Sequence, residues 1–384
     1  MKQGWEYKKL GEVASFFRGL TYSGKDEVSF SNNIVLRSNN IDLNTNTINF
    51  DELKFISDSI IIPKDKKLKK NSIFMCMSNG SKLHLGKVAF IDKEYPYAFG
   101  GFMGLIVPKE DELMPKMAYY YFCSQKFKTY LSSIGNGANI NNIKFVDIAK
   151  DTIPIPPKSI QLAIVSELDK INELIRLKKE QLKDYDKLAQ SIFYEMFGDP
   201  VENEKGWEVK KLIEVSTLLN GRAYKQNELL DSGKYKVLRV GNFFTNSNYY
   251  YSDLELDNEK YCYKGDLLFA WSASFGAFIW NEAKTIYHYH IWRVLFDKDC
   301  LNIHYYKYLL NTMTSFFMND VHGIGMVHLT KSGMEQYKLP LPPLPLQHLF
   351  AQRIEQIERQ KSAVQQSITD LETLLASRMQ YWFE

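Results

Sequence analysis

Residues 158–197 read KSIQLAIVSELDKINELIRLKKEQLKDYDKLAQSIFYEMF, and residues 344–383 read LPLQHLFAQRIEQIERQKSAVQQSITDLETLLASRMQYWF. In both stretches apolar residues recur every seven positions in two columns, which is the a and d pattern of a coiled coil. In the first stretch one column is Leu168, Ile175, Leu182, Ala189 and Met196, and the other is Ile164, Ile171, Lys178, Tyr185 and Ile192. In the second stretch one column is Ile354, Lys361, Ile368, Leu375 and Trp382, and the other is Phe350, Ile357, Val364, Leu371 and Arg378. The pattern predicts two long helices, each with one narrow apolar stripe that needs a partner helix. Burial on all sides in a bundle is the alternative, but the many charged residues between the columns argue against it.

The same short sequence precedes both stretches. Residues 153–157 read IPIPP and are followed by Gln161, and residues 339–343 read LPLPP and are followed by Gln347, 186 positions later. Because proline cannot continue a strand ladder and favours an extended preceding residue, we expect an extended lead-in that stops where each helix begins. The two glutamines either belong to a face that partner proteins grip or act as simple helix caps.

The front of the chain is also duplicated. Residues 4–13 read GWEYKKLGEV and residues 206–215 read GWEVKKLIEV, 202 positions apart. Further matches at that spacing are Gly19 with Gly221, Tyr22 with Tyr224, Leu36-Arg37 with Leu238-Arg239, and Asn40 with Asn242. The chain is therefore a tandem duplication. The middles of the two copies differ in length and residue type, which indicates a shared scaffold whose two middles recognise different things.

Local patterns in both middles predict a mixture of strands and helices. Short β-branched and aromatic runs separated by Asn, Gly and Asp turns predict strands at residues 34–37, 72–77, 88–91 and 105–107. Aromatic residues at helical spacing predict helices at residues 116–132 and 303–318. The polar, turn-rich residues 198–206 are expected to join the two copies.

Composition narrows the class of protein. The 384 residues are 45% hydrophobic and 14% aromatic, enough to bury a core in each of two or three domains. No apolar run of about 18 residues and no signal peptide are present, so the cytoplasm is expected. Cys76, Cys123, Cys262 and Cys300 have no paired spacing, which predicts reduced thiols and no zinc site. The net charge of +3 means that any nucleic-acid surface is local.

This order of features resembles the specificity (S) subunit of Type I restriction-modification enzymes: two units that open with Gly-Trp and end in Ile/Leu-Pro-Ile/Leu-Pro-Pro, each followed by a coiled-coil helix, with Phe-Gly-Asp-Pro at residues 197–200 between them. The resemblance covers essentially the whole chain. It implies an α+β fold of two mixed target recognition domains joined by two long antiparallel helices with pseudo-two-fold symmetry. The expected divisions are 1–157 and 199–343 for the recognition domains, and 158–198 and 344–384 for the spacer helices.

The resemblance also implies the partners. These are double-stranded DNA, two modification (methyltransferase) subunits docked on the helices, and restriction subunits, in a system of DNA methylation and phage defence. S-adenosylmethionine, ATP and Mg are expected on the partner subunits and no cofactor on this chain. Lys361 and Arg378 are expected to weaken the helix seam.

An antiparallel helix pair has consequences for the chain and for its target. It would bring the end of the second helix back towards residues 1–4, so we expect the two termini to lie near each other. Two reading units on one face of B-DNA would meet half-sites about one helical turn, roughly 10 bp, apart. Because the middles differ, the predicted target is split and asymmetric.

Candidate DNA contacts follow from the chemistry of base edges: Arg pairs with guanine, Asn or Gln with adenine, and Lys, Ser and Thr bind the backbone. In the first copy the candidates are Arg37, Asn39, Asn40, Ser78, Asn79, Ser81, Lys82, His84, Lys87, Asn139, Asn141, Asn142 and Lys144. In the second they are Arg222, Lys225, Arg239, Asn242, Trp271, Ser272, Ser274, His288, His290, Arg293, His328 and Lys331. A turn or a solvated surface is the alternative for each. His288 and His290 have no third ligand at useful spacing, so a metal site is not expected.

No catalytic motif is recognised in the sequence. It has no Gly-rich phosphate loop, no Asn-Pro-Pro-Tyr tetrad, no carboxylate-plus-Lys nuclease cluster and no nucleophile elbow. The chain is therefore predicted to be non-catalytic. Two alternatives remain: a coiled-coil adaptor joining two protein-binding domains, and a nuclease with an unfamiliar active site.

Overall fold

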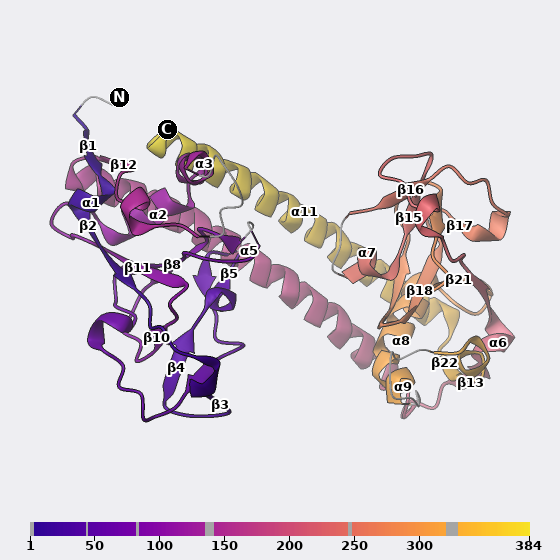
Figure 1. The fold of residues 1–384 in the computed structure, drawn as a ribbon. Helices are drawn as coiled ribbons and strands as arrows, with labels where there is room; N and C mark the ends of the chain where they lie inside the picture. The colour runs from indigo at the N-terminus through magenta and orange to yellow at the C-terminus, as the bar shows by residue number, and fades with distance from the viewer. Residues whose placement is uncertain (1–3, 44, 82–83, 135–141, 245–247, 320–328) are drawn as a thin grey trace. The chain divides into compact units, whose positions relative to one another are not determined.

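The fold is that of a computed structural model, which describes residues 4–43, 45–81, 84–134, 142–244, 248–319 and 329–384. The chain forms two compact units (Figure 1). Unit 1 comprises residues 1–179 and 367–384, and unit 2 comprises residues 180–366. Each unit therefore contains part of both long helices. The predicted four-part division into domains stays a prediction.

Unit 1 contains two four-stranded sheets and two smaller ladders. The main sheet is antiparallel, in the order β2 (Ala14–Arg18), β11 (Met103–Pro108), β8 (Ser72–Cys76), β9 (Val88–Ile91). The second sheet has the order β10 (Ala98–Phe99), β4 (Asn33–Leu36), β7 (Lys54–Ile56), β3 (Glu27–Val28). The ladders pair β1 (Glu6–Lys9) with β12 (Thr152–Ile155) and β5 (Ile41–Asp42) with β6 (Thr47–Ile48). The short helices are α1 (Leu10–Val13), α2 (Pro115–Cys123), α3 (Gln125–Ser133) and α4 (Phe145–Ile148).

Unit 2 repeats this plan. Its main sheet has the order β14 (Ser216–Asn220), β21 (Ile291–Phe296), β18 (Leu267–Ser272), β19 (Ser274–Ile279). Its second sheet has the order β16 (Tyr250–Ser252), β15 (Tyr235–Leu238), β20 (Thr285–Tyr287), β17 (Tyr261–Cys262). One ladder pairs β13 (Glu208–Lys211) with β22 (Lys338–Leu341). The short helices are α6 (Leu212–Val215), α7 (Val240–Phe244), α8 (Ile303–Thr312), α9 (Thr314–Asn319) and α10 (Lys331–Met334).

The structure confirms the predicted mixed fold and the four predicted strands, but each proline-rich lead-in is more regular than expected. β12 and β22 include Pro154 and Pro340, which pair with Tyr7 and Val209. A strand of a two-stranded ladder has a free edge, so proline can occupy a position whose N–H would point away from the partner. The expectation that proline would exclude these residues from a ladder was wrong.

The two predicted medium-length helices are each interrupted. Ser124 separates α2 from α3: its backbone is extended and its side chain accepts a hydrogen bond from Phe127 N (3.3 Å), which starts a new helix. Met313 separates α8 from α9. The aromatic pattern continued across both breaks, so the pattern did not reveal them.

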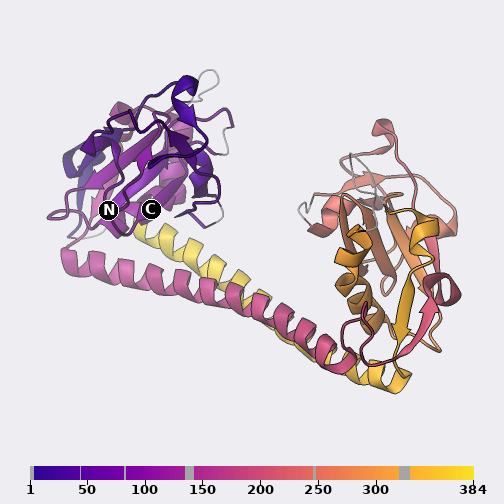
Figure 2. The ribbon, with the colours of Figure 1, turned by 90° about the horizontal axis from the view of Figure 1, so that it is seen from below.

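The two long helices span the predicted residues, α5 from Lys158–Phe197 and α11 from Leu344–Phe383. Within each unit their segments lie side by side (Figures 1 and 2). Lys179 Nζ lies 2.8 Å from Glu372 in unit 1, and Tyr185 donates to Gln360 at 2.6 Å in unit 2. Partner numbers fall along α11 as they rise along α5, so the segments are antiparallel.

Two charged residues in the apolar columns of α11, Lys361 and Arg378, form ion pairs with α5. Lys361 binds Asp186 on α5 at 2.7 Å. Arg378 binds Glu167, which also accepts a hydrogen bond from Trp382 Nε1 at 2.9 Å. These pairs join the two helices, so both side chains have partners across the stripe, and the expected weakening of the seam stays a prediction.

Gln161 and Gln347 are structural residues and not exposed docking residues. Gln161 is 1% exposed; its Oε1 accepts from Met114 N (2.8 Å) and its Nε2 donates to the carbonyls of Glu112 (2.9 Å) and Pro156 (3.0 Å). Gln347 is fully buried and makes the same three bonds to Asn302 N (2.8 Å), Cys300 O (2.9 Å) and Pro342 O (2.8 Å). Each glutamine therefore fastens the start of a long helix to its own unit, which excludes direct contact with a partner protein.

The described ends of the chain meet in unit 1. Trp5 stacks on Trp382 with ring centroids 6.2 Å apart, and Phe383 is buried in the core of the unit. The predicted proximity of the two ends is confirmed. In the part of the chain that the structure describes, no helix has an apolar stretch long enough to cross a bilayer.

We predict that replacing either buried glutamine destabilises the unit that contains it. Gln161→Leu leaves the N–H of Met114 and two carbonyls buried without partners, at a cost of about 2–4 kcal/mol in the free energy of unfolding. Gln347→Leu should cost a similar amount. Urea unfolding measures the change, and Gln352→Leu on the exposed surface of α11 is the control, expected to shift stability by less than about 0.5 kcal/mol. An unchanged unfolding midpoint for Gln161→Leu would contradict this role.

Candidate nucleic-acid interface

Backbone hydrogen bonds identify equivalent positions in the two units. Met77 N donates to Phe102 O at 2.9 Å in unit 1, and Trp271 N donates to His290 O at 3.1 Å in unit 2. Leu20 N bonds to Phe99 O in the same way as Arg222 N bonds to Tyr287 O. Residues 100–102 therefore correspond to residues 288–290. The two units can be compared position by position at this place.

An Arg–Asn turn is shared by both units. In unit 1 the side chain of Asn40 accepts a hydrogen bond from Arg37 N at 2.9 Å, and in unit 2 Asn242 accepts one from Arg239 N at 2.8 Å. Asn40 is fully buried and also donates to the carbonyls of Asn49 and Glu52, both at 3.3 Å. Asn40 therefore holds the turn and is not available to read a base, and Asn242 has the same turn-forming bond.

The arginines of these turns have unused hydrogen-bonding capacity. Nε of Arg37 and Nε of Arg239 are both buried and have no hydrogen-bond partner among the described residues. Cζ of Arg239 lies 4.3 Å from the ring centroid of Tyr250, a cation–π contact. A buried donor without a partner is unfavourable. Within the part of the chain that the structure describes, the same group therefore lacks a partner at the same place in both units.

A hollow of about 1000 Å³ in unit 1 brings together predicted residues from separate parts of the chain. Arg37, Asn39, Ser78 and Asn79 all line it. Asn79 donates to Ser38 Oγ at 3.0 Å and accepts from Ser81 N at 2.9 Å, so its orientation is set by the two loops. The hollow thus places several polar groups in defined positions within a lining that is mostly apolar and that also includes Glu27 and Glu52.

A second hollow of about 310 Å³ lies next to the first, because Arg18, Gly101 and Met103 line both. It adds Asn142 and Lys144, which are exposed. Three predicted clusters, at residues 37–40, 78–82 and 136–144, therefore meet on one surface of unit 1. Of the predicted residues in these clusters, Lys82, Asn139 and Asn141 lie outside the described residues.

Two other candidates in unit 1 are Lys87, which makes an internal hydrogen bond, and His84. Lys87 is 8% exposed and its Nζ donates to Ile41 O at 2.9 Å, and burial lowers its pKa. His84 has a buried Nδ1 with no hydrogen-bond partner in the described part of the chain. Lys87 ties two loops together and its ammonium is not available to a phosphate.

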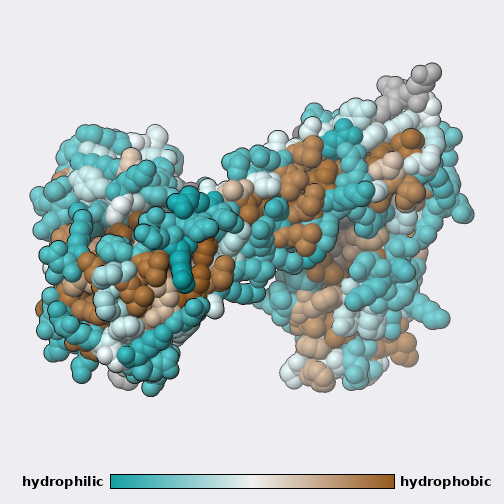
Figure 3. Space-filling model, turned by 180° about the vertical axis from the view of Figure 1, so that it is seen from behind, coloured by the Kyte–Doolittle hydropathy of each residue, from teal (hydrophilic) through white to brown (hydrophobic). Residues whose placement is uncertain are grey.

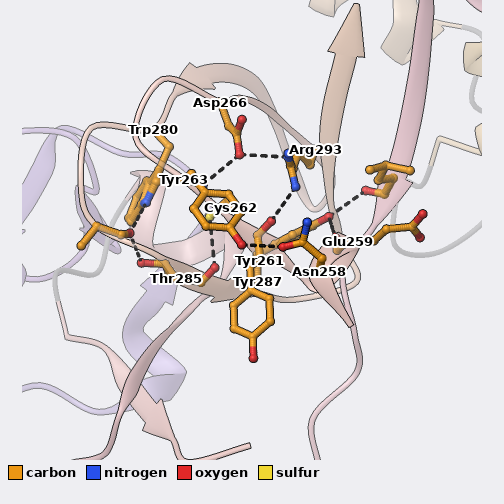
Figure 4. Close-up of polar contacts among 12 residues, drawn as sticks. Asn258, Glu259, Tyr261, Cys262, Tyr263, Asp266, Trp280, Thr285, Tyr287 and Arg293 are labelled. Atoms are coloured by element: carbon orange, nitrogen blue, oxygen red, sulfur yellow. Dashed lines mark hydrogen bonds and ion pairs between the residues drawn. The ribbon is translucent and has the colours of Figure 1, made fainter. Parts of the chain in front are cut away.

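Unit 2 contains its own internal ion pairs. Arg222 binds Glu228 through two bonds of 3.0 and 2.8 Å, and this arginine lowers the pKa of Glu228 to about 2. Arg293 lies 2.9 Å from Asp266 and donates to Tyr261 O at 3.0 Å (Figure 4). Both arginines are committed to the protein. Lys225 is exposed, and its backbone N–H bonds to Glu228 at 2.8 Å.

Aromatic side chains fill unit 2 at the place that corresponds to residues 100–102. The rings of Tyr289 and His290 are 3.9 Å apart, and His290 meets Trp271 edge-on at 5.2 Å. Trp271 in turn stacks on Trp292 at 5.3 Å. The units therefore share their turns but present unlike surfaces at the same place.

His288 belongs to this aromatic group and is held neutral. Burial, with the nearby charges of His290 and Arg239, lowers its pKa to about 4. Among the described residues no group of three His, Cys, Asp or Glu side chains could hold a metal.

Of the remaining candidates in unit 2, Ser272 and Ser274 pair with each other between β18 and β19, and Lys331 lies on α10. Ser272 is 1% exposed, and its hydroxyl has no hydrogen-bond partner within the described segments. Ser274 is half-buried at the start of β19. Lys331 is exposed at the start of α10, 3.7 Å from Glu335. His328 lies outside the described residues.

The sequence analysis missed Arg18 and Phe102. Arg18 lines both hollows and its Nε donates to Gly101 O at 3.4 Å. Phe102 lines the larger hollow and is 72% exposed. A large apolar residue directly after two glycines, in a segment between strands, was the signal that could have identified Phe102.

We predict that His288 makes the stability of unit 2 depend on pH. Its pKa of about 4 in the folded protein lies below the ordinary value of about 6.5, so the unfolded chain takes up the proton first as the pH falls. The free energy of unfolding should therefore decrease between about pH 6.5 and pH 4. Urea unfolding at about pH 7 and pH 5 should show a smaller loss for His288→Gln than for the wild type. An equal loss in both proteins would contradict the shifted pKa.

Comparisons with known proteins agree on one family. A family model described as Type I restriction modification DNA specificity domain matches residues 2–184 and 204–373. The chain is 26% identical over 296 residues to the Type I restriction enzyme EcoKI specificity subunit of Escherichia coli (strain K12), covering 70% of this chain and 61% of that protein. It is 24% identical over 261 residues to the StySPI specificity subunit of Salmonella potsdam, covering 63% of this chain and 54% of that protein. The chain thus spans less than two thirds of the length of these relatives.

Solved structures have a similar fold. A chain from a structure of a type I R-M system matches with a TM-score of 0.60 and 17% identity, covering 99% of this chain and 97% of that chain. The S subunit of a Type I restriction-modification system from M. genitalium matches with a TM-score of 0.54 and 14% identity, covering 100% and 98%.

Proposed function

Because the chain belongs to the family of Type I restriction modification DNA specificity domains, we propose that it is the DNA-recognition subunit of a Type I restriction-modification complex and reads a bipartite, asymmetric target. Unit 1 would read one half-site and unit 2 the other. The observation that carries this proposal is the pair of unlike surfaces at equivalent positions. In unit 1 Arg37, Asn39 and Asn79 line a hollow together with apolar groups, whereas Trp271, Tyr289 and His290 form an aromatic cluster in unit 2.

The shared Arg–Asn turns fit contacts with the DNA backbone. Arg37 and Arg239 occupy the same place in units that would read different bases, so their common ligand must be a feature that every duplex has. The phosphate backbone is such a feature, and phosphate contacts position a protein without specifying sequence. The differing residues around each turn would then supply base readout.

The helix pair would set the distance between the half-sites and dock the partners. Each helix has 40 residues, about 60 Å at 1.5 Å per residue. Leu174, Leu177 and Leu188 on α5 and Leu374 on α11 are nearly half exposed and lie outside the apolar columns. Hydrophobic residues also form patches on the surface in Figure 3. Exposed apolar side chains of this kind are suited to a protein interface, and two modification subunits are the proposed occupants, with restriction subunits joining them.

The chain itself is proposed to be non-catalytic and to act in the cytoplasm. Methyl transfer from S-adenosylmethionine and cleavage driven by ATP and Mg would belong to the partner subunits. Methyltransferase or nuclease activity of the purified chain alone would overturn this assignment.

Methylome mapping tests the proposal directly. The chain is co-expressed with the methyltransferase encoded beside it, and methylated adenines are mapped genome-wide. We expect a split motif that disappears when the chain is deleted, because the chain supplies the sequence recognition. Methylation that is unchanged by the deletion would favour a coiled-coil adaptor that never touches DNA.

The spacer is tested by lengthening both helices. One heptad is inserted after Lys179 in α5 and one after Gln366 in α11, which preserves the seven-residue stripe. Seven residues add about 10 Å of helix, so the gap in the methylated motif should grow by about 3 bp while the bases read stay the same. A change in the bases instead of the gap would contradict the spacer role.

The two turn arginines are tested by salt dependence. Arg37→Ala and Arg239→Ala should each weaken binding to target and unrelated duplexes alike, and should each reduce the slope of log affinity against log salt by about one. Arg176→Ala removes an equal charge from α5, where Arg176 pairs with Glu173 at 2.6 Å, and serves as the control. Loss of preference for one base at unchanged salt slope would show base readout rather than phosphate contact.

A further inference from the structure

Phe102 differs from Phe30, another exposed phenylalanine of unit 1, in that it lines the larger hollow. Its side chain is 72% exposed at the edge of the hollow that contains Arg37 and Asn79. Leaving a phenylalanine in water forgoes the favourable burial of its ring. The exposed ring is therefore a candidate contact for whatever the hollow binds.

The backbone that carries Phe102 is firmly held. Its carbonyl accepts hydrogen bonds from Met77 N (2.9 Å) and Ser78 N (3.1 Å). Met103 N donates to Gly100 O at 2.8 Å, which closes the turn that contains Phe102. A Cβ at Gly101 would lie 3.2 Å from Thr21 Oγ1, so the segment fits closely against its neighbours. The ring is presented from a rigid turn and not from a long loose loop.

Polar groups flank this ring. Arg18 lines both hollows of unit 1, Asn79 lines the larger and Asn142 the smaller. These groups can satisfy the donors and acceptors of base edges, whereas Phe102 needs an apolar surface. In the major groove the one apolar group on a base edge is the C5-methyl group of thymine.

We propose that Phe102 is a specificity-determining residue that contacts the C5-methyl group of a thymine in the half-site read by unit 1. This inference rests on the proposed function. His290 holds the equivalent position in unit 2, and its ring packs against Tyr289 (3.9 Å) and Trp271 (5.2 Å). The methyl contact therefore belongs to one half-site only.

The test removes the methyl group and the ring separately. The full chain, in complex with its co-expressed methyltransferase subunits, is titrated with a fluorescent duplex carrying the mapped motif. Each thymine of the motif is replaced in turn by deoxyuridine. For the wild type we expect one position at which affinity falls roughly fourfold, the effect of one buried methyl group. Phe102→Ala should bind the thymine duplex with the same fall in affinity, and it should no longer distinguish thymine from deoxyuridine at that position. Phe102→Leu should retain part of the discrimination.

Phe30→Ala is the matched control. Phe30 is 78% exposed in the same unit, packs against Phe55 at 5.4 Å and is not among the residues that line either hollow. Phe30→Ala should bind with the same affinity as the wild type and should distinguish thymine from deoxyuridine to the same extent.

Three results separate the possible failures. If Phe102→Ala still distinguishes thymine from deoxyuridine at the position where the wild type does, or if the wild type discriminates at no position, the methyl contact is overturned. In a duplex that carries 2-aminopurine, a rise in its fluorescence that depends on Phe102, without any effect of deoxyuridine on affinity, would show that the ring inserts between base pairs. That result would also overturn the methyl contact. If the wild-type complex does not prefer its motif to an unrelated duplex, the proposed function fails instead.

Discussion

Each long helix carries one continuous apolar stripe on a surface that is otherwise mainly polar, with a few exposed leucines, so neither helix could bury that stripe except against another segment of the protein. In unit 1 the stripe places Ile164 and Leu168 in the core with Phe383, and in unit 2 it places Phe350 and Ile354 in the core with Phe193. Full burial of one such side chain contributes about 1.5–3 kcal/mol. The cross-helix ion pair of Lys361 with Asp186 adds a directional contact that favours one register. Each globular core is thus completed by both helices.

The duplication separates what the two units share from what distinguishes them. The shared parts are the ones that hold the chain in place: the buried glutamine at the start of each long helix and the Arg–Asn turn of each unit. At residues 100–102 and 288–290, which hold equivalent places, the side chains of the two units differ. A frame that is stabilised by its own hydrogen bonds can accept changes at such exposed positions with small effects on folding.

Sequence periodicity predicted the longest elements best. The heptad pattern predicted both long helices because forty residues sample the stripe many times, and strand runs such as residues 88–91 were bounded by clear turn residues. The breaks at Ser124 and Met313 could not be predicted from the aromatic pattern, which continues through them. The prediction that proline would keep β12 and β22 out of a ladder failed because a strand with a free edge tolerates proline. Whether a strand has a free edge depends on its pairing and not on its local sequence.

The candidate interface was only partly predictable for a related reason. Residue type suggested Arg37, Asn39, Ser78 and Asn79, and these do line one hollow. Residue type also suggested Asn40, Lys87 and Arg293, whose polar groups are used within the fold. An amide or a cation looks the same in sequence whether it faces solvent or a neighbouring carbonyl. Arg18 and Phe102 were missed because their place beside the hollows depends on long-range contacts: Arg18 pairs with Gly104 of β11, and the carbonyl of Phe102 accepts from Met77 N.

The two hydrogen bonds to the carbonyl of Phe102 have a thermodynamic consequence. A recognition loop that is disordered before binding must give up conformational freedom when it engages its ligand, and that loss reduces affinity. A turn that is already ordered in the free protein has little such freedom to lose. Selectivity at this point would then arise from the fit between rigid surfaces, and the association would show a smaller entropic penalty than the binding of a flexible loop.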